Sequence, residues 1–540
     1  MTTAPKPSDQ PRSTSPRHLA DQATGPQERP RGRAISRRLA AGCGALATAA
    51  GLAISALVAQ LVDPAAFPVT AIGNRLIELF PADLVNWGKE NLGTADKPVL
   101  LAGVAVVALG LGAVAGLLAA RRRHLEWLVV VPLAVVCLAA AFSGADASFP
   151  LTALPTLAAV AVTVPVLVTL LDRAEWRRFP NGSMDPAGRR SFLTAATGAG
   201  AATVIGFGGS RVLEATIAPG SGSVPPLPTP AATASIPAGA ELALPGLSPY
   251  VTPAKDFYRI DTALVVPRIS ADDWQLSIVG MVRKPLTIDY ATLTSRTLVE
   301  HVTTLTCVSN EVGGNLAGNA VWLGLPIREL LAEAEPLPGA DMVLSRSQDG
   351  FTAGTPLDAL TDPDRQALLA VGMNGEPLPR AHGYPVRMVV PGLYGYVSAT
   401  KWVVELKVTT FDADQGYWTP LGWSARGPIK LASRIDVPRA GGEVTSGPVV
   451  VAGVAWAQHT GVKAVEVRVD EGPWQPATLA EVTSSDTWRQ WHFTWTANPG
   501  EHLVQVRAQD ATGAWQIEAE ARPDPDGATG LHGVQVTVKA

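Results

Sequence analysis

The chain has 540 residues, more than one domain usually accommodates, so two or three hydrophobic cores are expected. A formal net charge of -4, with 17% charged residues, gives no broad basic surface and argues against nucleic acid as a partner. The apolar residues are unevenly distributed, because long apolar runs fill the first 212 positions and a mixed, globular texture follows.

Residues 1–38 form a polar opening segment. Pro, Ser, Thr, Gln and Arg dominate the first 30 or so positions, and almost no large apolar side chain is present to offset the entropy lost on ordering. Arginines then stand directly before the first apolar run. We therefore expect a disordered cytoplasmic tail.

Residues 39–212 contain about five apolar runs that suit transmembrane helices. At 1.5 Å per residue, about 20 residues cross a hydrocarbon layer of roughly 30 Å. A cleavable signal peptide competes for the first run, but the later runs favour a permanent anchor. Gly112 and Gly116 have the spacing of a helix-pairing motif, which we attribute to chance in so glycine-rich a run. The expected spans are 39–62, 99–120, 125–142, 154–171 and 192–212.

Basic clusters set the expected orientation of these spans. They precede the first span and separate the second from the third and the fourth from the fifth, so the positive-inside rule puts them all in the cytoplasm. Everything after residue 212 then lies outside. The last span opens with Arg189 to Leu193, RRSFL, which resembles a twin-arginine export signal. An ordinary positively charged flank explains the same residues equally well.

After the expected spans, three segments of different amino-acid composition follow. Residues 213–245 are rich in Pro, Ala, Ser and Gly and are typical of an extended linker. Residues 246–425 mix short β-rich runs with helical periodicity, as at 326–334, which indicates an α+β domain. Residues 426–540 alternate apolar and polar side chains between turns, as at 465–469, which predicts an all-β sandwich of immunoglobulin type.

Cys307 is the only cysteine after residue 212. Apolar residues lead into it, and polar residues and glycines follow at once, so we expect a strand that delivers a thiol to a loop. A disulfide within this part of the chain is excluded, and the thiol is a candidate reactive group or metal ligand. A single thiolate holds a transition metal poorly, so further ligands would have to come from another molecule. A buried structural cysteine is the alternative.

Four segments after residue 246 carry a family resemblance. They are Phe257 to Thr262, the stretch from Thr304 to Gly314 around the cysteine, Met373 to Pro379, and His382 to Trp402. In this order they resemble the sulfite oxidase family of molybdenum enzymes, which includes plant nitrate reductases and bacterial protein-methionine-sulfoxide reductases. The resemblance covers about residues 247 to 540. It implies a molybdenum-molybdopterin cofactor with Cys307 as metal ligand, and a C-terminal dimerisation domain that makes a homodimer.

The resemblance also assigns residues to the cofactor and the substrate. Molybdopterin carries a phosphate, and phosphate sites use arginine forks, lysine charges and N–H groups of glycine-rich turns. The resemblance puts Arg259 beside the metal and the substrate. The alternative role for Arg259 is an ion pair with Asp261. The implied cofactor-binding residues are Arg259, Ser309, Asn310, His382, Arg387 and Lys401, and the implied catalytic residues are Arg259 and Cys307.

Two positions depart from the sulfite oxidase pattern. Val312 stands five residues after the cysteine, where sulfite oxidases carry an arginine, and Trp423 stands five residues after Trp418, where they carry a tyrosine. A small dianion is best held by several charge-assisted hydrogen bonds. We therefore expect a pocket that is less positive and more apolar than that of a sulfite oxidase.

These features together predict a membrane-anchored, extracytoplasmic molybdopterin-dependent oxidoreductase that transfers an oxygen atom on a small substrate, with sulfur compounds as candidates. A reductase of sulfoxides or related oxides, fed from the membrane, is one alternative. A non-catalytic anchored interaction module is another, although Cys307 and the phosphate-side residues argue against it. The sequence has no CxxCH haem signature, iron-sulfur spacing or dinucleotide-binding glycine motif, so a separate cytochrome or quinone system is the expected electron partner.

Overall fold

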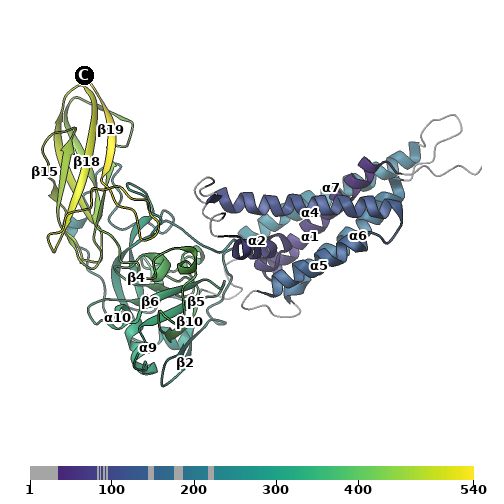
Figure 1. The fold of residues 1–540 in the computed structure, drawn as a ribbon, viewed down its shortest axis with the longest axis horizontal. Coiled ribbons are helices and arrows are strands. Elements are labelled where there is room, and N and C mark those ends of the chain that lie inside the picture. The colour runs from purple at the N-terminus through teal and green to yellow at the C-terminus, as the bar shows by residue number, and fades with distance from the viewer. Residues whose placement is uncertain are drawn as a thin grey trace, which may run out of the picture.

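The computed structural model describes residues 35–81, 95–143, 151–174, 186–216 and 224–540, together with Leu84, Trp87, Gly88 and Leu92. The tail expected over residues 1–38 therefore lies almost wholly outside the described residues. A helical bundle is followed in chain order by a mixed α/β region and a β-sandwich (Figure 1), which confirms the predicted fold class.

The helical bundle contains four described helices that are long and apolar enough to cross a membrane. They correspond to the first, second, fourth and fifth predicted spans. The third predicted span corresponds to α5, an apolar helix of 16 residues. A twelve-residue helix, α2, was not expected. The described helices are α1 (Arg37–Leu61), α2 (Pro68–Leu79), α4 (Asp96–Arg121), α5 (Trp127–Phe142), α6 (Leu154–Ala174) and α7 (Pro186–Thr216).

Glycines bring α1 and α4 into close contact. A Cβ atom on Gly112 would lie 2.1 Å from Thr48 Oγ1, and one on Gly116 would lie 2.2 Å from the Ala40 carbonyl oxygen. From the other side, a Cβ on Gly44 would meet the Gly112 carbonyl oxygen at 2.0 Å. The Gly112 and Gly116 spacing is therefore a helix-packing face, and attributing it to chance was wrong. Only glycine lets the two backbones approach this closely.

The mixed region contains two sheets around one core, which includes the buried side chains of Trp274, Trp322 and Leu330. In the first sheet, of order β2-β1-β10-β5-β6, only the β1 and β10 pair is parallel. In the second, of order β3-β4-β7-β8, β9 also pairs with β7. The elements are β1 (Gln275–Gly280), β2 (Leu286–Asp289), α8 (Tyr290–Thr294), β3 (Val299–Thr306), β4 (Ala317–Pro326), α9 (Ile327–Ala334), β5 (Met342–Ser347), β6 (Thr352–Pro356), α10 (Leu357–Thr361), β7 (Leu368–Met373), β8 (Glu376–Pro377), β9 (Arg387–Val389) and β10 (Val403–Thr409).

The C-terminal region packs two sheets face to face, as the period-two pattern predicts. Val465 and Val467 on β14 point into the core, where Trp491 and Val504 are also buried. The sheets have the orders β11-β13-β17-β16 and β12-β19-β18-β14-β15. Their strands are β11 (Ala432–Val437), β12 (Gly442–Thr445), β13 (Gly447–Trp456), β14 (Val462–Val469), β15 (Gln475–Pro476), β16 (Thr478–Leu479), β17 (Arg489–Ala497), β18 (Gly500–Asp510) and β19 (His532–Lys539).

Hydrogen bonds from the linker and from α4 are among the contacts that join these regions. The described part of the expected linker, residues 224–245, is extended and hydrogen-bonds to the mixed region at Leu298 and to the sandwich at Gln490. At the end of the bundle near α2, Lys97 Nζ donates to the carbonyl oxygens of Asp261 (2.6 Å) and Ala263 (2.8 Å). Figure 1 shows this end of the bundle next to the mixed region. The segment that contains Arg259 is thus attached to a helix of the bundle.

Candidate functional site

The loop between β3 and β4 begins with Cys307. Its N–H group donates to the Leu316 carbonyl oxygen at 2.9 Å, and Asn310 Oδ1 accepts from the Leu316 N–H group at 2.8 Å. The Cys307 Sγ atom lies 3.0 Å from Ser309 Oγ and is partly buried. The strand therefore delivers the thiol to a loop, as the sequence predicts, and the Asn310 side chain closes that loop.

The far side of the same loop is packed against the sandwich. Gly313 has φ +76°, and a Cβ atom there would lie 2.2 Å from His532 Cδ2. Arg434 Nη1 donates to the Gly314 carbonyl oxygen at 2.8 Å, while His532 Nδ1 accepts from the Ile435 N–H group at 2.9 Å. The C-terminal region therefore helps to fix the position of the cysteine loop.

Tyr258 lies near the start of the cysteine loop. A Cβ atom on Gly395 would be 3.9 Å from both Tyr258 Oη and the carbonyl oxygen of Thr306, the residue before Cys307. Phe257 stacks on the Tyr258 ring at a centroid distance of 5.3 Å. Burial, and then the negative charge of a Cys307 thiolate, raises the pKa of Tyr258. Its hydroxyl therefore keeps its proton at neutral pH.

Arg387 and His382 form a buried basic pair. Burial, followed by the nearby charge of Arg387, lowers the pKa of His382 to about 4, so its imidazole is neutral at pH 7. Its Nε2 lies 2.9 Å from the Ala254 carbonyl oxygen, which assigns the proton to Nε2 and leaves Nδ1 as an acceptor. The Arg387 guanidinium lies 5.0 Å from the centroid of the Trp322 ring. Its three hydrogen bonds go to the carbonyl oxygens of His382, Met388 and Ala399.

Lys401 and Arg259 share one carboxylate. Asp261, whose side chain is 3% exposed, forms ion pairs with both. Lys401 Nζ also donates to the Ile260 carbonyl oxygen at 3.1 Å. Burial, and then the charges of Arg259 and Lys97, lowers the pKa of Lys401, while contact with the Asp261 carboxylate favours its charged form. The ion pair foreseen as the alternative role of Arg259 is present, and it extends to Lys401.

The two positions that depart from sulfite oxidases lie in different surroundings. Val312 is 38% exposed and lies 3.4 Å from a Cβ atom built on Gly530 of the sandwich. Trp423 belongs to an aromatic cluster, with ring centroids 6.0 Å from Tyr396 and 6.2 Å from Trp418. Both positions therefore contribute apolar surface in place of an arginine and a phenol.

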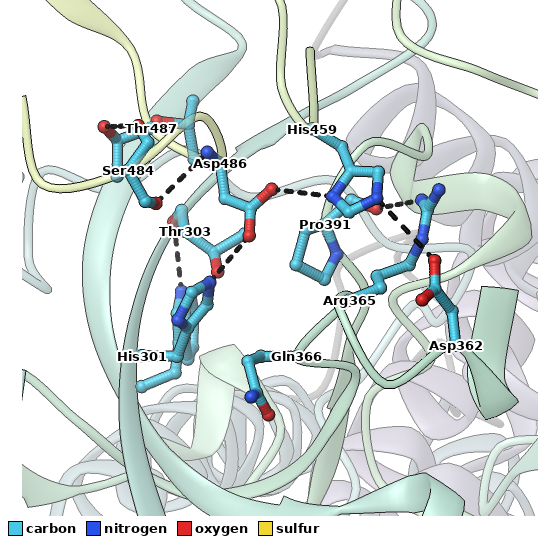
Figure 2. Close-up of polar contacts among 12 residues, drawn as sticks. His301, Thr303, Asp362, Arg365, Gln366, Pro391, His459, Ser484, Asp486 and Thr487 are labelled. Carbon is cyan, nitrogen blue, oxygen red and sulfur yellow. Dashed lines mark hydrogen bonds and ion pairs between the residues drawn. The ribbon is translucent and has the colours of Figure 1, made fainter. Parts of the chain in front are cut away.

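A polar network joins the mixed region to the sandwich (Figure 2). Asp486 accepts from His301 Nε2 on β3 at 2.8 Å and from His459 Nδ1 at 3.1 Å. His459 Nε2 lies 3.8 Å from Asp362 Oδ2, which follows α10. Burial raises the pKa of Asp486, but the hydrogen bonds from the two histidines outweigh it, and the net pKa lies below its usual value. Asp486 is therefore a buried carboxylate that accepts hydrogen bonds from both regions.

Comparison with known proteins identifies the mixed region. Residues 263–418 match the family model described as the oxidoreductase molybdopterin binding domain. This region is an oxidoreductase molybdopterin-binding domain. The match starts four residues after Arg259 and ends at Trp418. It therefore includes the cysteine loop, His382, Arg387 and Lys401, but not Arg259.

Sulfite oxidases are among the proteins that match about half of this chain. Human mitochondrial sulfite oxidase is 27% identical over 317 residues, which are 50% of this chain and 58% of the relative. Arabidopsis thaliana sulfite oxidase is 26% identical over 331 residues, 51% of this chain and 84% of the relative. The structure of the sulfane dehydrogenase SoxCD from Paracoccus pantotrophus is 24% identical, with a TM-score of 0.48, over 55% of this chain and 82% of that one. The match spans 52% of the Drosophila melanogaster sulfite oxidase and 58% of the human and Macaca fascicularis sulfite oxidases, a little over half of each.

The residues of the molybdopterin-binding domain fit its cofactor. Cys307 offers a soft sulfur ligand at the start of a loop. The described residues contain no cluster of three or more His, Cys, Asp and Glu side chains that could hold a metal without a cofactor. Arg387 is 5% exposed and forms no ion pair with a described carboxylate. A buried cation of this kind is stabilised by a bound anion. The phosphate of molybdopterin is such an anion.

The domain brings most of the predicted site residues together. A Cβ atom on Gly383 would lie 2.8 Å from Arg387 Cβ and 3.1 Å from Lys401 Cγ, and Arg259 is close enough to influence the pKa of His382. Tyr258 and Asp261 were not predicted as site residues. Both flank Arg259 in the segment FYRIDT, and that segment was the available signal.

Proposed function

We propose that this protein is a membrane-anchored molybdenum oxidoreductase whose catalytic domain lies on the extracytoplasmic side and transfers an oxygen atom to or from a small substrate. The observation that carries the proposal is the presence of Cys307 and a buried Arg387 in one domain that binds molybdopterin. The Cys307 thiol offers a metal ligand. No described carboxylate neutralises Arg387, so its guanidinium requires a bound anion.

The location follows from the bundle. Four described helices are long and apolar enough to span a membrane. The basic residues Arg121 and Arg173 stand at the ends of α4 and α6 that lie away from the catalytic domain. The positive-inside rule puts those ends in the cytoplasm and the catalytic domain outside. A twin-arginine signal at Arg189 to Leu193 is consistent with this orientation.

The chain's own residues then have defined roles. Bound molybdopterin supplies the metal and the two-electron oxygen-transfer chemistry. Cys307 would ligate the metal, and Arg387, His382 and Lys401 would hold the pterin and its phosphate, with Ser309 and Asn310 beside them on the cysteine loop. Tyr258 keeps its proton and would donate a hydrogen bond next to the thiol. Arg259, exposed and held by Asp261, would orient a polar substrate.

Val312 and Trp423 bear on the choice of substrate. Each contributes apolar surface where a sulfite oxidase has an anion-binding group, so fewer charge-assisted bonds are available to hold a dianion. A small sulfur anion is one candidate substrate. The apolar side chains of Val312 and Trp423 make a neutral oxide, such as a sulfoxide, the second candidate. In that case the reaction runs as a reduction.

The partners are also proposals. The C-terminal sandwich is expected to form a homodimer, and electrons are expected to pass to or from a cytochrome or a membrane quinone. Mass photometry of detergent-solubilised protein should give twice the monomer mass. A purely monomeric distribution would argue against the dimer.

One experiment tests the function directly. We expect purified protein to contain about one molybdenum per chain, and to turn over either sulfite or a model sulfoxide with artificial electron carriers. The Cys307→Ser variant should lose turnover. A wild-type protein that lacks molybdenum after expression in a host that makes the cofactor would contradict the proposal and would favour the non-catalytic interaction module.

A further inference from the structure

The helical bundle contains an apolar cavity of about 440 Å³ that is partly open. Its wall comes from α1, α2, α4, α5 and α6, and no charged side chain belongs to it. Sites for small molecules usually measure roughly 300 to 1,000 Å³, so the space suits a ligand rather than a packing defect. An anchor alone does not require such a space.

The cavity is long and starts at the catalytic end of the bundle. On α4 its wall extends from Leu100 to Ala115, about 22 Å at 1.5 Å per residue. Leu100 lies one helical turn from Lys97, which donates to the Asp261 and Ala263 carbonyl oxygens of the catalytic domain. Figure 1 shows α2, which also lines the cavity, at this end.

The cavity is partly open along α4. Val107 and Leu111, one turn apart on this helix, both line the cavity and are exposed, Val107 at 62%. In a membrane this face would meet the lipid, so a hydrophobic molecule could enter laterally without crossing water.

One polar group in the wall has no partner. Thr156, at the start of α6, is 2% exposed, and its Oγ1 atom makes no hydrogen bond to any residue that the structure describes. A buried hydroxyl without a partner costs about 1 to 3 kcal/mol, so a ligand that offers an acceptor would be bound favourably there. Thr156 is at the catalytic end of the cavity, because the carbonyl oxygen of the preceding Pro155 accepts from Ser55 Oγ on α1 at 2.7 Å, and Gln60, five residues further along α1, contacts Arg268.

These features define the chemistry of the occupant. It needs a long, uncharged hydrocarbon chain, and a head with a hydrogen-bond acceptor at the end that faces the catalytic domain. A phospholipid fits poorly, because its charged headgroup would find no charged side chain in the wall. We propose that the cavity binds an isoprenoid quinone, with a ring carbonyl at Thr156 and the prenyl chain along α4.

This inference rests on the proposed function and names its electron partner. Transfer of the oxygen atom of water to a substrate S releases two electrons and two protons. The quinone Q is the oxidant that accepts the electrons and the protons, so that S + H2O + Q gives SO + QH2. In the opposite direction the quinol supplies the electrons and protons that reduce an oxide SO to S and water. The helices that line the cavity then have a purpose that a single anchoring helix would not serve.

The test measures binding and turnover separately. Full-length protein in nanodiscs made from quinone-free lipid is titrated with menaquinone-4 and, as a tail-free comparison, menadione. We expect saturable binding of menaquinone-4 and binding of menadione at least tenfold weaker. Thr156→Val should weaken binding about three- to tenfold, the range for one lost hydrogen bond.

Matched variants test the location of the site. Ala108→Phe on α4 and Ala134→Phe on α5 put a ring into the cavity and should abolish binding. Ala102→Phe and Ala139→Phe make the same change at exposed positions of the same helices outside the cavity wall, and should bind like the wild type. Equal loss in both pairs, or no menaquinone-4 binding to the wild type, would overturn the proposal. Recovery of phospholipid chains from the cavity, lost only in the filled variants, would also overturn it.

Failure of this site and failure of the proposed function give different results. If menaquinone-4 does not bind but the enzyme turns over with artificial carriers, the site is wrong and the function stands. If menaquinone-4 binds and is displaced by the cavity-filling changes while no substrate is turned over with any carrier, the binding site stands and the enzymatic function fails.

Discussion

Arg387 is the residue on which cofactor retention should depend most. Its guanidinium is buried over the Trp322 ring with only carbonyl oxygens as partners, so a bound phosphate would be its natural counter-charge. We expect Arg387→Met to reduce the molybdenum content of the purified protein at least tenfold, measured by elemental analysis. The control Arg283→Met removes an exposed arginine that pairs with Glu335 and should leave the metal content unchanged. Full loading of Arg387→Met would contradict this role.

His382 should make stability depend on pH in the cofactor-free protein. Its folded-state pKa is about 4, below the ordinary value of about 6.5, so between these values the unfolded chain binds the proton and the folded chain does not. The contribution of neutral His382 to the free energy of unfolding is therefore fully present above pH 6.5. As the pH falls towards 4, the free energy of unfolding decreases by at most about 1.4 kcal/mol per pH unit. Thermal unfolding at pH 7 and pH 5 should give a smaller difference for His382→Gln than for the wild type.

A surface histidine provides a control of opposite sign. The hydrogen bond to Asp470 raises the pKa of His502, so its contribution is present at low pH and is lost as the pH rises. His502→Gln should therefore lose stability mainly at pH 5. An identical pH response of both variants would show that neither histidine controls it.

At the scale of elements, the contact between α1 and α4 leaves no room for a side chain. Gly116→Val would push a branched side chain against the Ala40 carbonyl oxygen, and overpacking of this kind typically costs about 1 to 3 kcal/mol. We expect a lower midpoint of thermal unfolding in detergent. Gly110→Val makes the same change on α4 where no neighbouring atom lies within 4 Å, and should leave the midpoint nearly unchanged. Equal midpoints for the two variants would contradict the close helix contact.

Asp486 provides the corresponding test at the boundary between the catalytic domain and the sandwich. Asp486→Asn keeps the shape of the side chain but removes the charge that two histidines face, and a broken buried hydrogen bond costs about 1 to 3 kcal/mol. We expect the sandwich to become more susceptible to proteolysis at pH 7. Asp524→Asn, at an exposed position of the sandwich, should behave like the wild type. An unchanged cleavage rate for Asp486→Asn would show that the boundary does not depend on this carboxylate.

For the molecule as a whole, the order of the three regions and the nature of the site could be predicted from sequence. Hydropathy gave the long helices, period-two alternation gave the sandwich, and short motifs marked the residues around Cys307. These signals are local, so residues near one another in the chain carry them. The shared carboxylate of Asp261 joins its neighbour Arg259 to Lys401, which lies 140 positions after Asp261, and no local pattern reveals such a contact.

The same reasoning explains the other omissions. The close approach of Gly313 to His532 joins two domains, and the Gly116 contact depends on which helix packs beside α4. A sequence pattern shows which side chains lie on one face of a segment. It does not show which other segment packs against that face. The helix-pairing glycines were therefore visible in the sequence, while their significance was not.

The attachment of Lys97 to the Asp261 and Ala263 carbonyl oxygens has a mechanical consequence. A transmembrane helix adapts to a thicker or thinner bilayer by changing its tilt. Because Lys97 stands in the first turn of α4, a change in tilt would pull directly on the segment that carries Arg259. Turnover measured in bilayers of increasing acyl-chain length should therefore pass through an optimum, and Lys97→Met should flatten that profile. The membrane would then act as a mechanical input to the active site.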